Sequence, residues 1–149
     1  MFVEHMRESA YGAYRIRLEV LLHIPTDATD QDIHDLIEAG FSAGTVKTLF
    51  ESGSIRPRAR DQIIPLKTLK TRLARGQRLT LRESDSLSRV VHITAMAEVL
   101  FGCDERSKRW LSKSKSRFSG KSPIEMLSTT EGARQVEEML IQVAEGLAF

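Results

Sequence analysis

Residues 57–76, with the sequence PRARDQIIPLKTLKTRLARG, combine the spacing of a helix-turn-helix with many cationic side chains. The small residue that lets two helices cross closely is Ala59, and the apolar residues Ile64 and Leu69 follow at intervals of five. Pro65 cannot continue the first helix, because it lacks a backbone N–H and its ring clashes with the preceding turn, but it can open the second. The chemistry of such a unit is recognition of duplex DNA from the major groove.

The second helix of this unit is expected to turn Leu66, Leu69 and Leu73 inward and its polar side chains outward. Such polar side chains can reach base edges and phosphate oxygens from a helix in the major groove. The predicted DNA-binding residues are Lys67, Thr68, Lys70, Thr71, Arg72 and Arg75. The turn position that is commonly glycine is Ile63, so the backbone there is either left-handed at a steric cost or forms another turn. The alternative interpretation is an amphipathic helix with a solvated basic face.

Charge is strongly segregated along this chain of 149 residues, although its formal net charge is only +2. Residues 56–82 carry nine basic side chains and one acidic side chain, and residues 106–121 carry seven basic and no acidic ones. The segments 1–55, 83–105 and 122–149 are each net acidic. Concentrated cationic segments favour local contacts with polyanions. The first of them coincides with the helix-turn-helix pattern.

A second helix-turn-helix pattern can be drawn through Leu36, Gly40 and Val46. Its surroundings are acidic, and its second helix offers only Lys47 to a polyanion. DNA affinity depends strongly on the counterions that cationic side chains release from the phosphates, so DNA binding by this acidic segment is disfavoured. We therefore predict that residues 29–39 and 43–52 form framework helices.

Helix signals dominate the rest of the chain. The capping-box pattern occurs at Thr80–Glu83, Ser122–Glu125 and Ser128–Glu131, where a hydroxyl and a carboxylate satisfy each other's backbone amides. An apolar stripe at helical spacing runs from Leu81 to Phe101. There is no alternating β-branched run and no Asn-Gly or Asp-Gly hairpin turn. The sequence therefore predicts an all-α protein.

Residue patterns that would support catalysis or metal binding are missing from the sequence. The segment Gly120–Ser122 is similar to the end of a phosphate-binding loop, but the required glycine five positions earlier is Lys115. Cys103 has no metal-ligand spacing with any of the four histidines, which are His5, His23, His34 and His92. We therefore predict no enzyme activity, no cofactor and no metal. A lone cysteine and the lack of a membrane-spanning apolar run favour a cytoplasmic protein without a membrane partner.

Four ordered stretches of the sequence resemble one known family. They are RLARGQRLTLRESDSLSRVVHITAMAEVLFG at 72–102, RWL at 109–111, GKSPIEML at 120–127 and TTEGARQVEEMLIQVAEG at 129–146. Together they resemble the Xre/MbcA/ParS toxin-binding family, the antitoxins that pair with RES-domain toxins. Members of the RES–Xre type also carry an Xre-like helix-turn-helix immediately before this domain. That position agrees with the basic helix-turn-helix pattern.

The resemblance implies an N-terminal helix-turn-helix domain, residues 1–78, packed on a small helical toxin-binding domain, residues 79–149. It implies a bacterial type II antitoxin that neutralises its cognate RES-domain toxin, an enzyme that degrades NAD⁺. It also implies a homodimer that binds operator DNA and represses its own operon. By this resemblance the C-terminal helix and tail cover the entrance of the toxin's active site. The implied toxin-binding residues are Glu145, Gly146, Leu147, Ala148 and Phe149.

The resemblance further implies that Glu83–Asp85 and Arg89 fix the junction between the two domains. Residues 112–122 are more basic than the corresponding loop of the family, so toxin contact, DNA contact and a solvated loop all stay open. Two other classes of protein fit parts of this pattern. One is a stand-alone helix-turn-helix regulator or partition-type DNA-binding protein without a toxin, and the other is a pure protein-interaction module. A RES-domain reading frame beside this one would favour the antitoxin.

Overall fold

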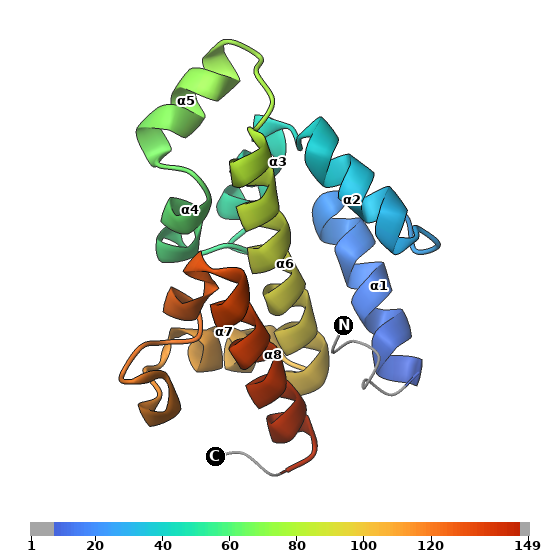
Figure 1. Cartoon of the computed structure of the whole chain (residues 1–149), viewed down its shortest axis with the longest axis vertical. Helices are drawn as coiled ribbons and strands as arrows, with labels where there is room; N and C mark the ends of the chain where they lie inside the picture. The colour runs from blue at the N-terminus through green and yellow to red at the C-terminus, as the bar shows by residue number, and fades with distance from the viewer. Residues whose placement is uncertain (1–7, 147–149) are drawn as a thin grey trace.

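The computed structural model describes residues 8–146, and its elements are helices (Figure 1). Within this range the only strand-like pairing is one isolated bridge between Ser42 and Arg78. The all-α prediction is therefore confirmed. The α-helices are α1 (Glu8–Leu22), α2 (Asp30–Ala39), α3 (Ala43–Glu51), α4 (Pro57–Ile63), α5 (Leu66–Ala74), α6 (Leu81–Phe101), α7 (Asp104–Ser112) and α8 (Thr130–Ala144). Short 3₁₀ turns at Ser116–Phe118 and Glu125–Ser128 lie between α7 and α8.

Helix α6 is the central element of the fold. It packs against α1, α2, α4, α7 and α8, whereas α3 packs on α4 and α5 (Figure 1). The α6 side chains Leu87, Val90, Val91, Ile93 and Met96 are almost completely buried. They belong to one hydrophobic cluster that includes buried residues from every other α-helix except α2, which packs against it through the half-buried Ile33 and Ile37. The predicted division at residue 78 falls in the segment between α5 and α6, and the core continues across it.

The ends of α6 follow the signals in its sequence. Thr80 accepts a hydrogen bond from the backbone N–H of Glu83, and the Glu83 carboxylate accepts one from the Thr80 N–H, so the predicted capping box is confirmed. Gly102 ends the helix in the left-handed conformation that glycine adopts without a Cβ clash. The two framework helices are also present, as α2 and α3.

The start of α8 differs from the prediction. The N-cap is Thr129, whose hydroxyl accepts a hydrogen bond from the Gly132 N–H at 2.9 Å, so the predicted box between Ser128 and Glu131 is wrong. Glu131 pairs with Arg134 on the next turn instead. The reciprocal bonds between Ser122 and Glu125 do form, but the helical turn that they open is a short 3₁₀ turn.

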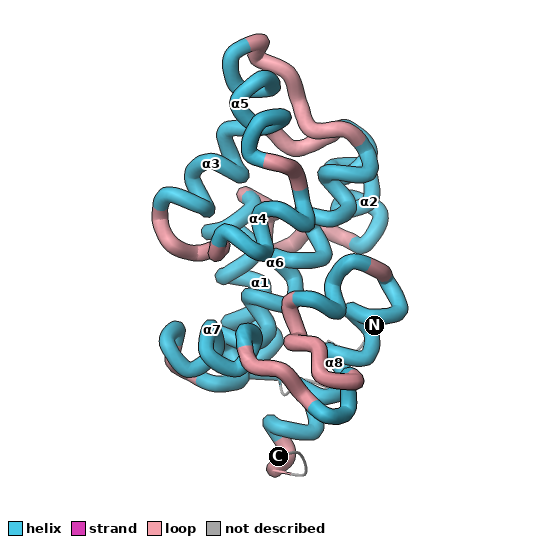
Figure 2. The backbone as a smooth tube through the Cα atoms, turned by 90° about the vertical axis from the view of Figure 1, so that its left-hand side faces the viewer, coloured by secondary structure: helices cyan, strands magenta, loops and turns pink. Residues whose placement is uncertain are grey.

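Tube and ribbon views together show an elongated molecule with α5 at one end and the end of α8 at the other (Figures 1 and 2). Within residues 8–146 no helix is both long and apolar enough to cross a bilayer.

The N-terminal end of α8 is fixed by a close approach between Gly132 and the backbone of Met126. A Cβ at this position would lie 1.9 Å from the carbonyl oxygen of Met126, which ordinary packing forbids.

This close approach predicts that Gly132→Ala lowers the free energy of unfolding by about 3 kcal/mol, because the 3₁₀ turn before α8 must move. The matched control is Gly12→Ala in α1, where a Cβ meets no atom within 4 Å. That change is expected to raise stability by about 0.5–1 kcal/mol, since alanine has the higher helix propensity. Urea denaturation measures both variants. Equal stability of the two would contradict the packing described at Gly132.

Candidate functional site

Helices α4 and α5 form the predicted helix-turn-helix. They are joined by only Ile64 and Pro65, both in extended backbone conformations. Ile63 is the last residue of α4, so the turn needs no left-handed residue and the second of the two predicted alternatives is correct. Ala59, Ile63 and Ile64 are buried, as the spacing required. The sharp bend follows from Pro65, which keeps the preceding residue extended.

The apolar face of α5 is narrower than predicted. Leu69 is buried and Leu73 is half-buried, but Leu66 is 42% exposed, so its predicted inward position is wrong. The reason is that Leu66 is the first residue of the helix, directly after the bend and about one turn before the buried Leu69. The buried anchor of α5 is therefore Leu69.

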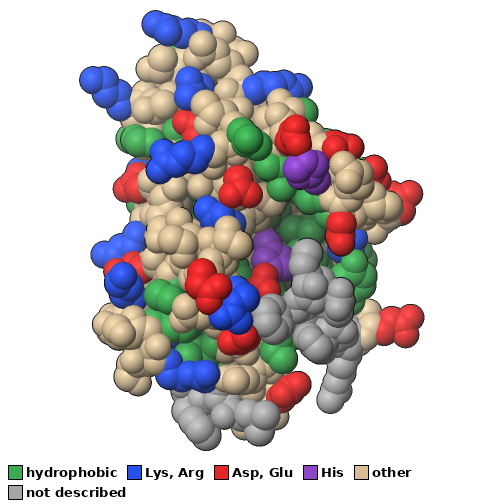
Figure 3. Space-filling model, in the orientation of Figure 1, with side chains coloured by type: hydrophobic (Ala, Val, Ile, Leu, Met, Phe, Trp, Pro, Cys, Tyr) green, Lys and Arg blue, Asp and Glu red, His purple; other side chains and the backbone are tan. Residues whose placement is uncertain are grey.

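The exposed face of α5 is cationic. Lys67, Lys70, Thr71 and Arg75 are exposed, and Thr68 is half-buried. This helix projects at one end of the molecule, where the space-filling view shows several Lys and Arg side chains (Figure 3). Four of the six predicted DNA-binding residues thus share an open surface at the tip of the molecule.

Arg72, another of the predicted residues, is engaged within the protein. Its Nε and Nη2 atoms donate to the two carboxylate oxygens of Glu83 at 3.4 and 3.2 Å. Glu83 also accepts from the Thr80 backbone N–H at 2.8 Å. Burial acts to raise the pKa of Glu83, but the hydrogen bonds from Thr80 and Arg72 outweigh it and hold the pKa below its usual value of 4.5. The ion pair fixes the end of α5 to the start of α6.

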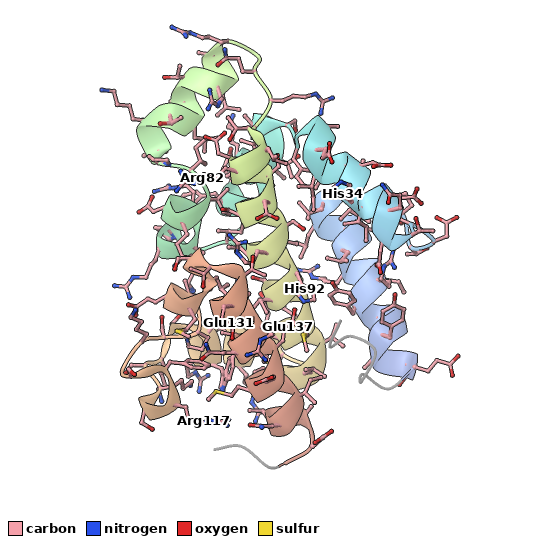
Figure 4. The ribbon with its side chains drawn as sticks, viewed as in Figure 1. His34, Arg82, His92, Arg117, Glu131 and Glu137 are labelled. Carbon is pink, nitrogen blue, oxygen red and sulfur yellow. The ribbon has the colours of Figure 1, made fainter. Side chains whose placement is uncertain are left out.

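Arg82 extends the exposed basic surface beyond α5. It is exposed near the start of α6, on the side of that helix toward α4 and α5 (Figure 4). Arg82 belongs to the basic segment 56–82, but a linear sequence pattern predicts no binding role for it, because nothing in that pattern brings the start of α6 beside the helix-turn-helix.

The residues at the start of α6 that were expected to fix the domain junction contact segments that come before and after α6 in the chain. The Ser84 hydroxyl accepts a buried hydrogen bond from the Phe41 backbone N–H at 3.0 Å. The Arg89 guanidinium donates to the Leu127 carbonyl oxygen at 2.9 Å and to the Thr130 hydroxyl at 3.3 Å. The first half of α6 therefore holds both the loop after α2 and the segment before α8.

A second set of polar contacts joins α1, α6 and α8 near the middle of α6. The Tyr14 hydroxyl lies 2.5 Å from Nδ1 of His92, and Nε2 of His92 lies 2.5 Å from a carboxylate oxygen of Glu137. All three groups are satisfied when Tyr14 donates to Nδ1 and Nε2–H donates to Glu137. Burial raises the pKa of Tyr14 well above its usual value, so the phenol stays protonated. His92 and Glu137 face each other between α6 and α8 in Figure 4, and the chain of bonds joins α1 to α8.

Two of the predicted toxin-binding residues lie at the far end of α8. Glu145 and Gly146 follow the helix and are exposed. Leu147, Ala148 and Phe149 lie outside the described residues. The inner face of α8 is buried through Val136, Met139 and Leu140, so the helix itself belongs to the core. Among residues 8–146 no cluster of three or more His, Cys, Asp or Glu side chains is arranged to hold a metal ion.

Comparisons with known proteins match this chain to antitoxins. The family model described as the Antitoxin Xre/MbcA/ParS C-terminal toxin-binding domain matches residues 96–146. A curated protein named Antitoxin Xre from Pseudomonas putida is 54% identical over 146 residues, which cover 98% of this chain and 92% of that protein. The chain belongs to the Xre family of antitoxins. Its residues 96–146 match a domain that is described as toxin-binding.

A more distant Antitoxin Xre, from Yersinia enterocolitica, is 30% identical over 117 residues, covering 76% of this chain and 78% of that protein. The toxin-binding domain matched by the family model begins within α6 and ends after α8. It contains neither α4 nor α5, so the basic helix-turn-helix is separate from the matched segment. The predicted boundary at residue 79 lies upstream of it and stays a prediction.

The contacts of Glu83 predict a dependence of stability on pH. Because the pKa of this group is lower in the folded chain, its contribution is complete above pH 4.5 and is lost as the pH falls through the folded-state pKa. Glu83→Gln removes this contribution, so the variant should be less stable at neutral pH and approach the wild type in acid. Urea denaturation at a series of pH values measures the difference.

Glu105→Gln, at an exposed position near the start of α7, is the control. A constant difference between wild type and Glu83→Gln at all pH values would contradict the ion pair with Arg72.

Proposed function

We propose that this antitoxin neutralises a RES-domain toxin that degrades NAD⁺ and represses its own operon as a DNA-bound homodimer. The observation that carries the proposal is the presence, on one chain, of a matched toxin-binding domain and a separate exposed cationic helix. The toxin-binding domain ends at the opposite end of the molecule from α5 (Figure 1). Two separated surfaces fit two different partners.

The DNA-binding part of the proposal rests on α5. Its exposed face offers Lys67, Lys70 and Arg75 for phosphate and base contacts and Thr71 for a hydrogen bond. Arg72 supports this face by fixing the helix to α6 through Glu83. A single short recognition helix covers only a few base pairs, so a homodimer with two half-sites about 34 Å apart supplies the missing affinity.

The toxin-binding part of the proposal rests on the end of α8 and the tail. Glu145 and Gly146 are exposed, and three mostly apolar residues follow them in the sequence. An exposed helix end that continues into apolar side chains is suited to enter a groove on a partner. We propose that Glu145, Gly146, Leu147, Ala148 and Phe149 cover the entrance of the toxin's active site.

For DNA binding we predict that the double substitution Lys67→Gln and Lys70→Gln weakens binding to the protein's own promoter region about tenfold or more. Each lost phosphate contact should also reduce the slope of log affinity against log salt by about 0.9. The control is Arg106→Gln, which removes an exposed cationic side chain from α7. Fluorescence anisotropy over a salt series measures both variants. Unchanged affinity and slope would refute the role of α5.

For neutralisation we predict that a chain ending at Ala144 fails to restore growth when co-expressed with the toxin from the adjacent reading frame. The reason is that the truncation removes the proposed contact with the active-site entrance, while α8 keeps its buried inner face. The truncated chain should still bind promoter DNA, and the Lys67 and Lys70 double variant should still neutralise. Full neutralisation by the truncated chain would exclude the tail from the mechanism.

A further inference from the structure

One face of α1 carries exposed apolar side chains that have no role in the core. Ile16 is 61% exposed and Val20 is 59% exposed. They lie one helical turn apart, so they share one face. The same face continues through exposed Ala13 and Gly12, and a Cβ on Gly12 would meet no atom within 4 Å. The opposite side of α1 packs on α6 through Tyr14 and other buried residues.

A groove of about 600 Å³ lies beside these side chains, between α1 and α3. Val20 and Leu21 form its α1 wall, while Gly44, Thr45 and Thr48 form much of its α3 wall. The α3 side chains are small, so the groove is open enough to accept a large apolar side chain. We call this surface, with Ile16 and Val20 and the groove, the α1–α3 face.

The protruding side chains of Ile16 and Val20 and the groove between α1 and α3 thus lie next to each other on one surface. A two-fold symmetric interface uses one patch twice, so that patch must be complementary to itself. Two exposed branched side chains next to a groove lined by small residues meet this condition. A flat or uniformly convex apolar surface would not.

The α1–α3 face carries little net charge, which indicates the kind of partner that it can bind. The titratable side chains among the described residues lining the groove are Arg17, which already pairs with Glu98, and His23. At its edge, Lys47 and Glu51 pair with each other at 3.7 Å. In a chain of which 28% is charged, such a nearly neutral surface suits a partner that brings no net charge to it.

Other surfaces are unsuited to pairing with themselves. Exposed α2 residues are strongly acidic, including Asp30, Asp32 and Asp35, and α5 is strongly basic. Two copies that met through either surface would place like charges together, which opposes association. By charge, the α1–α3 face is the one of these three that can meet its own copy.

We infer that the α1–α3 face binds the same face of a second copy of this chain. This inference names the surface of the proposed homodimer and rests on that part of the proposed function. Helix α1 runs broadly along the long axis of the molecule, and α5 projects at one end of that axis (Figure 1). A two-fold axis along this direction leaves both α5 helices at the same end, as binding of one DNA duplex requires.

The test is the oligomeric state of the full chain, measured by sedimentation equilibrium over a range of concentrations. The wild type is expected at twice the chain mass of 16.8 kDa. Val20→Glu buries an unpaired carboxylate in the interface, so its dissociation constant should rise by about 100-fold or more. Because Val20 is mostly exposed in the single chain, the variant should keep its circular dichroism and melting temperature as a monomer.

Leu81→Glu is the matched control, since Leu81 is also 59% exposed but lies at the start of α6 and does not line the groove. It is expected to remain dimeric. A monomeric wild type, or a Val20→Glu variant that stays dimeric, would overturn the inference.

Cross-linking gives a second, independent measurement. In a Cys103→Ser background, Ile16→Cys and Leu81→Cys each carry a single thiol. A short bis-maleimide should join two copies through position 16 and leave the chain with the thiol at position 81 uncoupled. The reverse pattern would overturn the inference. Neither measurement involves DNA or toxin. A chain that dimerises through this face but does not bind its promoter would contradict the DNA-binding proposal and leave the inference about the face intact.

Discussion

The burial of the middle of α6, residues 90–97, is the constraint on which the rest of this structure depends. A helix of 21 residues with apolar side chains around most of its circumference is stable in water only when other helices surround it. Helices α1 and α2 from the N-terminal part and α7 and α8 from the C-terminal part supply that cover. Helices α5 and α8, the segments proposed to contact DNA and a toxin, are therefore joined to one core, and α5 and the end of α8 lie at opposite ends of the molecule (Figure 1).

Polar contacts then determine how these helices are arranged around α6. Buried polar groups cost free energy unless they are hydrogen-bonded, so each satisfied pair selects one packing among many. Ser84 binds the backbone of Phe41, and the Gln62 amide donates to the Ile124 carbonyl oxygen at 2.7 Å. The bonds from Tyr14 through His92 to Glu137 hold α1 and α8 in the same way.

Features that depend on neighbouring residues could be predicted from the sequence. The bend at Pro65, the cap at Thr80 and the helix-turn-helix spacing from Ala59 to Leu69 arise from local sterics and hydrogen bonding, and the structure has all three.

Features that depend on distant residues could not be predicted from the sequence. Arg72 follows the pattern of a DNA contact, but its partner Glu83 lies on another helix. The start of α8 was misplaced because Thr129 competes with Ser128 for the capping role, and the close approach at Gly132 decides between them. The roles of the DNA-binding and toxin-binding residues stay predictions.

The central claim is that one rigid molecule presents separate surfaces to DNA and to a toxin. The most direct measurement is the composition of a mixture of this antitoxin, the toxin from its adjacent reading frame and a promoter duplex, resolved by size exclusion with light scattering. The account predicts one species that contains all three components, because α5 and the end of α8 lie far apart on the molecule. Binary complexes in which toxin and DNA always exclude each other would contradict it.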